Sequence, residues 1–308
     1  MEKAFLGTLC IGLILLAGCG QEEPTYTVDL SKTQTVSLTR EENIVTYAFL
    51  PQYSHTVSHK RHRLLVDYLH HETGLNVKQI FPNTFDDHVR LVDQGKIDIS
   101  YSNPFIYVKI AQRFGARAFA RVVEAYGNKN FRGQIICRVD NQSIQRIADC
   151  RGKRWIAVDP GSAGGYLYPL GHFMENGLKK EDFAEIAFAP GPGGKQENVV
   201  LAVYAGRYDI GSIREGTLDV AASKIDVSQI RVLGHTRWYP GWVFAARKGV
   251  DEQTVSAIQG ALCRLDARDK QHAEILDAAD IVGFVPAEDK DFDGVRELAD
   301  TLGMNLEQ

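Results

Sequence analysis

The sequence predicts an α/β protein with two lobes, each built on a mainly parallel sheet covered by helices. Short segments rich in β-branched and aromatic residues alternate with segments whose apolar residues recur at helical spacing. This alternation is typical of a parallel sheet with crossover helices. The rhythm runs through the chain twice. Gly-Lys-Ile-Asp-Ile at 95–99 is echoed by Gly-Arg-Tyr-Asp-Ile at 206–210, and in both places a helix ends at glycine before a strand begins.

The folded region is expected to begin near Glu42. A segment over 44–50, rich in β-branched and aromatic residues, predicts the first strand. The first helix is expected over 61–73, because its apolar residues share one face and Gly74 can end it. The other elements expected in this half are a loop over 52–59, a strand over 75–81, a helix over 85–94 and a strand over 97–101.

The second half repeats the pattern with more strands. The expected strands cover 133–138, 155–158, 185–188, 208–212 and 231–235. The expected helices cover 143–150, 166–176, 196–204, 255–265 and 293–302. Gly177, directly after the second of these helices, and Gly206, two residues after the third, mark their ends.

The first twenty residues have the pattern of a bacterial lipoprotein signal. Lys3 precedes an apolar run over 4–16, which is shorter than the roughly 20 residues that a membrane-spanning helix needs. The following Leu-Ala-Gly-Cys, ending at Cys19, resembles a lipobox, which implies cleavage before that cysteine and acylation of its thiol. We therefore expect a signal peptide over 1–18, a polar tether over 19–41 and a domain anchored by lipid in the cell envelope, facing the periplasm or the exterior. The alternative is an ordinary secretory signal with an incidental cysteine.

Composition and motifs narrow the possible functions. The formal net charge is -4, so the protein has no global attraction for nucleic acid, and any anion must be bound by local groups. Neither a GxSxG nor an HExxH motif is present, which argues against an enzyme of those kinds. Without a CxxC pair we expect no metal, and we expect no cofactor.

Three cysteines remain in the expected mature chain after the lipidated one. Two of them, Cys137 and Cys150, flank a short turn-and-helix segment. Thiols outside the cytoplasm tend to pair, so a disulfide between these two is one expectation. The other is a pair of buried free cysteines, which behave as small apolar residues.

Four segments in a fixed order carry a resemblance to a known family. They are 91–104, the turn at 150–154, the loop at 158–166 and the strand at 206–214. Together they resemble the periplasmic substrate-binding proteins of phosphate, phosphite and phosphonate ABC importers (PhnD-like), over about 44–286. The resemblance implies a type II periplasmic-binding-protein (venus flytrap) fold with two chain crossings. Lobe one would comprise 42–130 and 233–308, and lobe two 131–232.

The resemblance implies a solute-binding lipoprotein that captures a small polar ligand for an ABC permease. The ligand class would be an oxyanion of the phosphonate, phosphite or phosphate type, or a relative. A narrower similarity, over 210–218 and 235–245, is to the sensor domains of tetrathionate-type histidine kinases, some of which are tied to sulfur oxyanions. It implies the alternative of a receptor of the same fold that signals to a sensor kinase.

The loop after the strand at 155–158 is the first candidate ligand site. Its residues are Ser162, Ala163, Gly164, Gly165 and Tyr166. Free N–H groups at a helix start favour an anion, and glycine lets the backbone approach it closely. The alternative is an ordinary turn in which the serine caps the helix. The family has Ser-Thr-Ser-Gly where this chain has Ser-Ala-Gly-Gly, so two hydroxyl donors are lost.

Arg214 is the second candidate, because it follows a strand whose carboxyl end should face the cleft. Its planar fork suits a tetrahedral oxyanion, and a surface ion pair is the alternative. Gln196 stands where phosphonate binders have a histidine. The remaining candidates, from the ends of the first and third strands, are Tyr53, Tyr101, Ser102 and Asn103. The tyrosines are alternatively core aromatics. The aromatic segment 238–242 is expected either to line the cleft mouth or to pack in the core.

Overall fold

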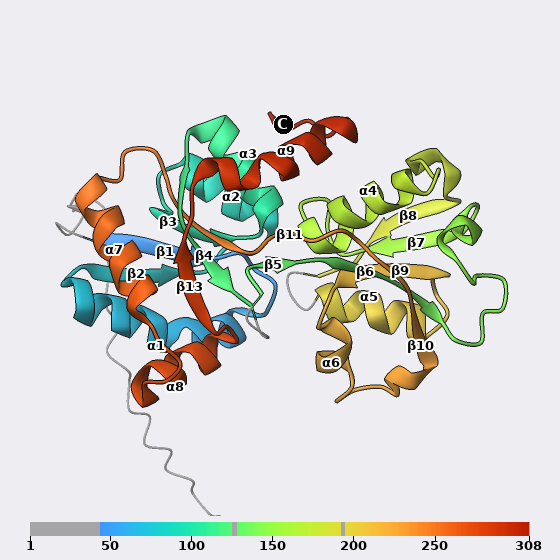
Figure 1. Cartoon of the computed structure of the whole chain (residues 1–308), viewed down its shortest axis with the longest axis horizontal. Coiled ribbons are helices and arrows are strands. Elements are labelled where there is room, and N and C mark those ends of the chain that lie inside the picture. The colour runs from blue at the N-terminus through green and yellow to red at the C-terminus, as the bar shows by residue number, and fades with distance from the viewer. Residues whose placement is uncertain (1–43, 125–127, 192–194, 308) are drawn as a thin grey trace, which may run out of the picture. The chain divides into compact units, whose positions relative to one another are not determined.

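Two separate β-sheets organise the chain, as the computed structural model in Figure 1 shows. The structure describes residues 44–124, 128–191 and 195–307. The expected signal peptide, the tether and Cys19 lie outside these residues. No described helix is long and apolar enough to cross a membrane.

The first sheet has the strand order β13-β4-β12-β3-β1-β2. Its strands are β1 (Ile44–Phe49), β2 (Asn76–Ile80), β3 (Ile99–Ser102), β4 (Arg117–Val123), β12 (Val243–Ala246) and β13 (Gly283–Pro286). β1 lies between β2 and β3 and is parallel to both, while β12 is antiparallel to β3 and β4. The chain therefore returns late to complete the sheet that it began. We call this sheet and its helices the first lobe.

The second sheet has the strand order β10-β6-β9-β7-β8. Its strands are β6 (Gly133–Arg138), β7 (Arg154–Ala157), β8 (Glu185–Phe188), β9 (Ile210–Arg214) and β10 (Ile230–His235). β7 is parallel to β8 and β9, and β6 is antiparallel to β9 and β10. This sheet with its helices is the second lobe. The α/β prediction with two lobes is confirmed.

Two short strands mark the places where the chain passes between the lobes. β5 (Asn130–Phe131) and β11 (Tyr239–Pro240) pair antiparallel, and Figure 1 shows them between the two sheets. Because β5 leads into β6 and β11 leads into β12, each is one crossing of the chain. The two crossings run side by side.

Helices cover both faces of each sheet (Figure 1). One face of the first sheet carries α1 (His55–Thr73), α7 (Glu252–Arg264) and α8 (Lys270–Ala279), and the other carries α2 (Phe85–Asp93), α3 (Pro104–Phe114) and α9 (Asp293–Thr301). On the second sheet, α4 (Tyr168–Glu175) lies opposite α5 (Lys195–Tyr204) and α6 (Thr217–Ala221). A single π-helical turn, Ala163–Leu167, leads directly into α4.

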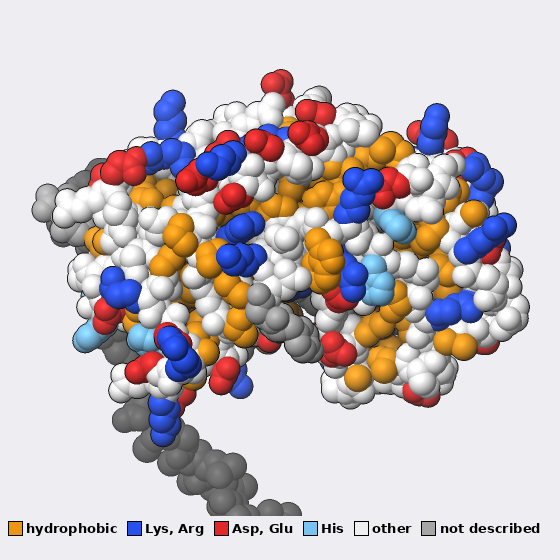
Figure 2. Space-filling view, viewed as in Figure 1, with side chains coloured by type: hydrophobic (Ala, Val, Ile, Leu, Met, Phe, Trp, Pro, Cys, Tyr) orange, Lys and Arg blue, Asp and Glu red, His pale blue; other side chains and the backbone are white. Residues whose placement is uncertain are grey.

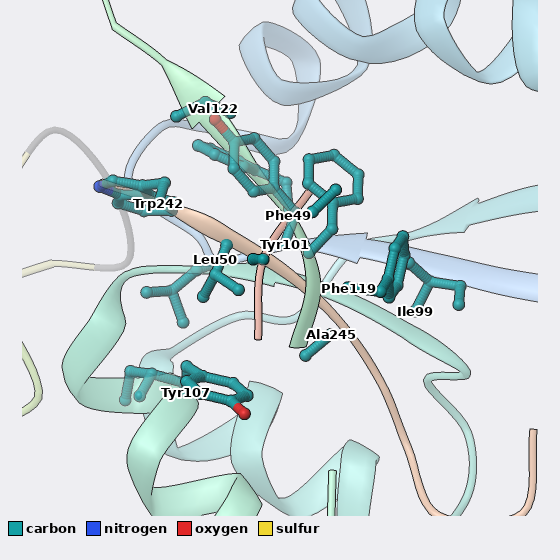
Figure 3. Packing of buried hydrophobic residues seen from close by; sticks show 14 of the residues in the cluster. Phe49, Leu50, Ile99, Tyr101, Tyr107, Phe119, Val122, Trp242 and Ala245 are labelled. Carbon is teal, nitrogen blue, oxygen red and sulfur yellow. The ribbon is translucent and has the colours of Figure 1, made fainter. Parts of the chain in front are cut away.

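An aromatic cluster fills the first lobe beside the crossings (Figure 3). The ring of Tyr101 stacks on Phe244 with centroids 4.4 Å apart, and Trp242 stacks on Phe49 at 5.3 Å. These rings come from β1, β3 and the start of β12, so strand pairing brings them together. The second lobe has separate apolar clusters, one on each side of its sheet.

Several helix predictions were wrong in length. α1 begins at His55, not at residue 61, because Ser54 caps it and its Oγ accepts a hydrogen bond from the N–H of Val57 at 3.4 Å. The helix expected over 143–150 is a single 3₁₀ turn, Ile147–Cys150. The elements α3, α8, β4, β12 and β13 were not predicted from the sequence.

The expected disulfide is absent, because Cys137 and Cys150 are free thiols. Both are fully buried in the same apolar cluster as Trp155. Burial raises the pKa of the Cys150 thiol to about 12, so the thiol stays protonated. The two cysteines thus act as small apolar residues in the core.

Candidate ligand-binding cleft

A cleft of about 690 Å³ receives residues from the carboxyl ends of strands in both lobes. From the first lobe come Gln52 and Tyr53, which follow β1, and Glu124, which follows β4. From the second lobe come Arg214 at the end of β9 and Gln196 on the first turn of α5. The carboxyl ends of parallel strands are where α/β lobes usually bind ligands.

A recess of about 10 Å³ adjoins this cleft. The two cavities share the side chains of Gln52, Phe131, Gln196 and Arg214. The recess is further lined by Phe85, Asn103, Ser162, Ala163, Gly164 and Trp242. The structure thus brings six predicted site residues to the recess and one more, Tyr53, to the cleft.

Arg214 connects the two lobes electrostatically. Its Nη2 lies 2.5 Å from Oε2 of Glu124, so the ion pair joins the end of β9 to the end of β4. The guanidinium carbon is 5.6 Å from the ring centre of Phe131. Burial works against the positive charge, but Glu124 and the hydroxyls of Tyr53 and Tyr101 raise the pKa of Arg214 above its ordinary value. The cleft therefore holds a permanent cation that one carboxylate already neutralises.

Gln196 supports this arginine from the second lobe. Its Oε1 accepts a hydrogen bond from the backbone N–H of Arg214 at 2.9 Å. The glutamine therefore fixes the end of β9. From the family's histidine at this position, we had expected Gln196 to contact the ligand. A glutamine amide has a separate donor end, so this role does not use up its polar groups.

Much of the glycine-rich loop's hydrogen bonding is internal. Ser162 Oγ accepts from the N–H of Gly165 at 3.1 Å, and Asp159 Oδ1 accepts from the N–H of Gly161 at 2.8 Å. The same aspartate pairs with Lys195 at 2.5 Å. The serine is thus the helix cap that the sequence left as an alternative. The N–H groups of Ala163 and Gly164, the first two of the helix, have no acceptor within the described part of the chain.

The two glycines of this loop serve packing. A Cβ at Gly164 would stand 2.8 Å from Cε2 of Phe131 and 3.2 Å from Cβ of Arg214. A Cβ at Gly165 would overlap Cγ2 of Val158. Glycine therefore lets the helix start lie directly on the crossing and on the strand ends. The close approach expected of a ligand at these positions is made here by protein groups.

Two aromatic candidates belong to the cores. Tyr166 packs edge-on against Phe188 at 5.0 Å, and burial raises the pKa of its hydroxyl. Tyr101 is buried in the first-lobe cluster. Their rings are core aromatics, the alternative that the sequence left open for Tyr101.

The remaining first-lobe candidates differ in how they are used. Asn103 caps α3 through Oδ1, and its Nδ2 donates to the carbonyl of Gly161 at 3.1 Å, a contact between the lobes. Ser102 is fully buried. Tyr53 faces the cleft beneath the guanidinium of Arg61, 4.6 Å from its ring centre.

Buried side-chain polar atoms that have no partner among the described residues occur on both sides of the cleft. They include Ser102 Oγ, Glu124 Oε1 and the indole Nε1 of Trp242 in the first lobe, and Gln134 Oε1 in the second. Glu124 was not predicted as a site residue, because a single acidic residue after a strand is not a recognisable motif. Gln52 and Phe131 were missed for the same reason. Trp242 belonged to the aromatic segment 238–242 and turns out to be both core and lining.

Charges of both signs surround the site. Figure 2 shows Lys and Arg mixed with Asp and Glu over the visible face, without a broad patch of one sign. Inside the cleft, Arg132 binds Glu215 through two hydrogen bonds of 2.9 and 2.6 Å. No group of three or more His, Cys, Asp or Glu residues suited to a metal occurs among the residues that the structure describes. Attraction for an anion must therefore be local.

Two α/β lobes, two chain crossings and a polar cleft between strand ends define a periplasmic binding protein of type II. The comparisons with known proteins agree. The family model for the phosphonate ABC transporter periplasmic substrate-binding protein matches residues 47–292. The chain belongs to this family and is a substrate-binding protein of the ABC-transporter type.

Individual relatives support the assignment. The chain is 26% identical over 320 residues to the phosphate-import protein PhnD of Mycolicibacterium smegmatis, covering 98% of this chain and 96% of that protein. PhnD1 of Prochlorococcus marinus, solved in complex with methylphosphonate, has a TM-score of 0.74 at 19% identity and covers 85% and 99% of the two chains. A phosphonate-transporter binding protein of Pseudomonas aeruginosa has a TM-score of 0.73 at 17% identity and covers 84% and 86%. The structural matches establish the shared fold.

Proposed function

We propose that this protein captures a small tetrahedral oxyanion of the phosphonate, phosphite or phosphate type in the cleft and delivers it to an ABC permease. The observation that carries the proposal is that Arg214 lines one recess between the lobes together with Ala163 and Gly164, whose N–H groups have no acceptor within the described part of the chain. Oriented donors and a guanidinium fork are the groups that bind oxyanions. The phosphate import of the M. smegmatis relative and the methylphosphonate bound by the P. marinus protein agree with this ligand class.

Glu124 narrows the ligand class further. Its Oε2 holds Arg214, while Oε1 is buried without a partner in the described part of the chain, and the residue lines the cleft. A ligand placed beside this carboxylate is bound best when it donates a hydrogen bond to it. Phosphate and phosphonate monoanions carry a P–OH near neutral pH, whereas sulfate carries no proton. We therefore propose selection against fully ionised sulfur oxyanions.

The other candidate residues receive roles within this proposal. Gln196 orients Arg214, Tyr53 covers the ligand from the first lobe, and Asn103 holds the lobes together through Gly161. Ser102, Ser162 and Gly165 support the site from behind, as do the rings of Tyr101 and Tyr166. The anchor proposed for this domain is the lipidated Cys19, after removal of residues 1–18 and with residues 19–41 as tether. The sensor-kinase alternative shares this cleft and differs only in the membrane partner.

Calorimetry with methylphosphonate, inorganic phosphate and sulfate tests the proposal. The wild-type protein should bind the first two and should bind sulfate at least tenfold more weakly. Glu124→Gln should reduce that discrimination about tenfold or more, because an amide can donate to a fully ionised oxygen while a carboxylate cannot. Glu288→Gln, at an exposed ion pair with Lys290, is the matched control and should leave all three affinities unchanged. Equal affinity for sulfate and methylphosphonate, or no binding of any of them, would contradict the proposal.

A further inference from the structure

The three tryptophans of the chain differ in what their indole N–H groups contact. Trp155 donates to Ser212 Oγ at 2.9 Å inside the second lobe. Trp238 is 46% exposed and can donate to solvent. Trp242 is only 3% exposed, and its Nε1 has no hydrogen-bond partner among the residues that the structure describes. Buried indole N–H groups usually have an acceptor, so this one needs an explanation.

The indole of Trp242 is held in a fixed orientation. The indole ring packs between the rings of Phe49 and Tyr101, with centroid distances of 5.3 and 5.4 Å. The backbone carbonyl of Trp242 accepts a hydrogen bond from the N–H of Val122 at 3.0 Å. Figure 3 shows the ring nitrogen at the end that points away from this aromatic cluster. Trp242 is also part of the wall of the recess beside Arg214. The packing therefore fixes the indole of Trp242 beside the recess.

The recess offers mainly donors, because most of its acceptors are engaged. Asn103 Oδ1 already accepts two backbone N–H groups, Gln196 Oε1 accepts from Arg214, and Ser162 Oγ accepts from Gly165. Gln52 offers either end of its amide. The hydrogen-bond donors that remain unbonded here are the Trp242 N–H and the free N–H groups of the helix start. Such a surface is complementary to a group that only accepts.

We infer that Trp242 is a ligand-binding and specificity residue that donates its indole N–H to one oxygen of the bound oxyanion from the first-lobe side. This inference rests on the proposed function. A recess of about 10 Å³ accommodates about one water-sized atom, so it receives one ligand oxygen while the rest of the tetrahedral group lies in the adjoining cleft. The ligand is thereby bound by donors from both lobes, which couples its binding to closure of the lobes.

The direct test is the indole N–H resonance of each tryptophan in protein labelled with ¹⁵N-tryptophan. Adding saturating methylphosphonate should move the Trp242 resonance downfield, and the Trp155 resonance should stay in place because its acceptor is Ser212. Spectra of Trp242→Phe assign the signal. If methylphosphonate binds by calorimetry and the Trp242 resonance does not move, the inference is overturned while the proposed function stands. If neither methylphosphonate nor phosphate binds the wild-type protein, both fail.

A near-isosteric substitution separates hydrogen bonding from packing. Replacing Trp242 by benzothienylalanine keeps the ring volume and removes the N–H. We expect methylphosphonate affinity to fall about tenfold to a hundredfold, with no drop in the melting temperature of the free protein, since no protein bond is lost. The same replacement at Trp155 should lower the melting temperature and leave affinity unchanged. Unchanged affinity at position 242, with wild-type binding intact, would overturn the inference.

Discussion

The two walls of the cleft are built differently. On the second-lobe wall, the polar side chains of the loop at 159–166 are bonded to neighbours, as the Ser162–Gly165 and Asp159–Gly161 contacts show. On the first-lobe wall, Glu124 and Trp242 each leave a buried polar atom without a partner among the described residues, and on the second-lobe wall, outside this loop, Gln134 Oε1 does the same. The loop at 159–166 is therefore a rigid frame with a few free backbone donors, and the first-lobe wall carries side-chain groups available to a ligand.

This difference shows what a glycine-rich loop signifies. The glycines at 164 and 165 are needed because Phe131, Arg214 and Val158 occupy the space where a Cβ would stand. They make the frame possible by letting backbone and strand ends meet. Discrimination between ligands is then left to the opposite wall, where Glu124 supplies an acceptor and Trp242 a donor.

Acid should destabilise the first lobe before the second, and this is the largest effect on stability that we expect. His62 and His88 are both buried in the first lobe, and burial lowers the pKa of each to about 3. In the unfolded chain each histidine is protonated below about pH 6.5, whereas in the native state it is protonated only near pH 3. The free energy of unfolding should therefore fall as the pH drops through this window, by about 2–3 kcal/mol per histidine at about pH 4.5.

Chemical denaturation between about pH 7.5 and 4 measures the effect, and amide hydrogen exchange assigns it to a lobe. His88→Gln should flatten the pH dependence, since it removes one of the two protonation sites. His71→Gln, whose side chain is 85% exposed, is the control and should not. Faster exchange in the second lobe than in the first on acidification would contradict the expected order.

Loss of the cation that joins the walls should have the next largest effect. Arg214→Ala removes a charge-assisted contact and should weaken methylphosphonate binding about a hundredfold by calorimetry. It also leaves Glu124 without its partner, so the free protein should lose about 1–2 kcal/mol of stability. This is less than at a fully buried pair, because 28% of the arginine side chain is exposed.

A double variant separates these two consequences. Arg214→Ala combined with Glu124→Gln removes both charges, so stability should return toward that of the wild type while binding stays weak. Binding restored to the wild-type level in the double variant would show that the arginine acts only by neutralising the glutamate. Arg214 would then have no direct contact with the ligand.

How much the sequence could predict follows from these residues. The alternating segments and the glycine stops locate most strands and helices, since burial and helix termination leave periodic patterns. Arg214 was predictable because it follows a strand, and Ser162 because it precedes a helix. Glu124 and Trp242 became site residues only because β12 inserts between β3 and β4, a late return of the chain that no local pattern reports.

The two cysteines show a second limit of prediction from the sequence. Cys137 and Cys150 are close in sequence, which suggested a disulfide in an extracytoplasmic protein. In the structure they lie in an apolar cluster with Trp155, where a thiol fills space as a small apolar side chain. Spacing along the chain reports proximity, but it does not report how two side chains are oriented.

The smallest expected effect tests the frame itself. Gly164→Ala places a Cβ 2.8 Å from the Phe131 ring and 3.2 Å from Arg214 Cβ, so one of them must shift. We expect a stability loss of about 1–2 kcal/mol in denaturant titrations, with a several-fold weaker affinity because Arg214 moves. Gly294→Ala is the matched control: it meets no atom within 4 Å and lies in α9, where alanine should stabilise by up to about 1 kcal/mol. If Gly164→Ala left the stability unchanged, the loop at 159–166 would accommodate the extra Cβ without cost. The loop would then not be a rigid frame, and the contrast with the first-lobe wall would not hold.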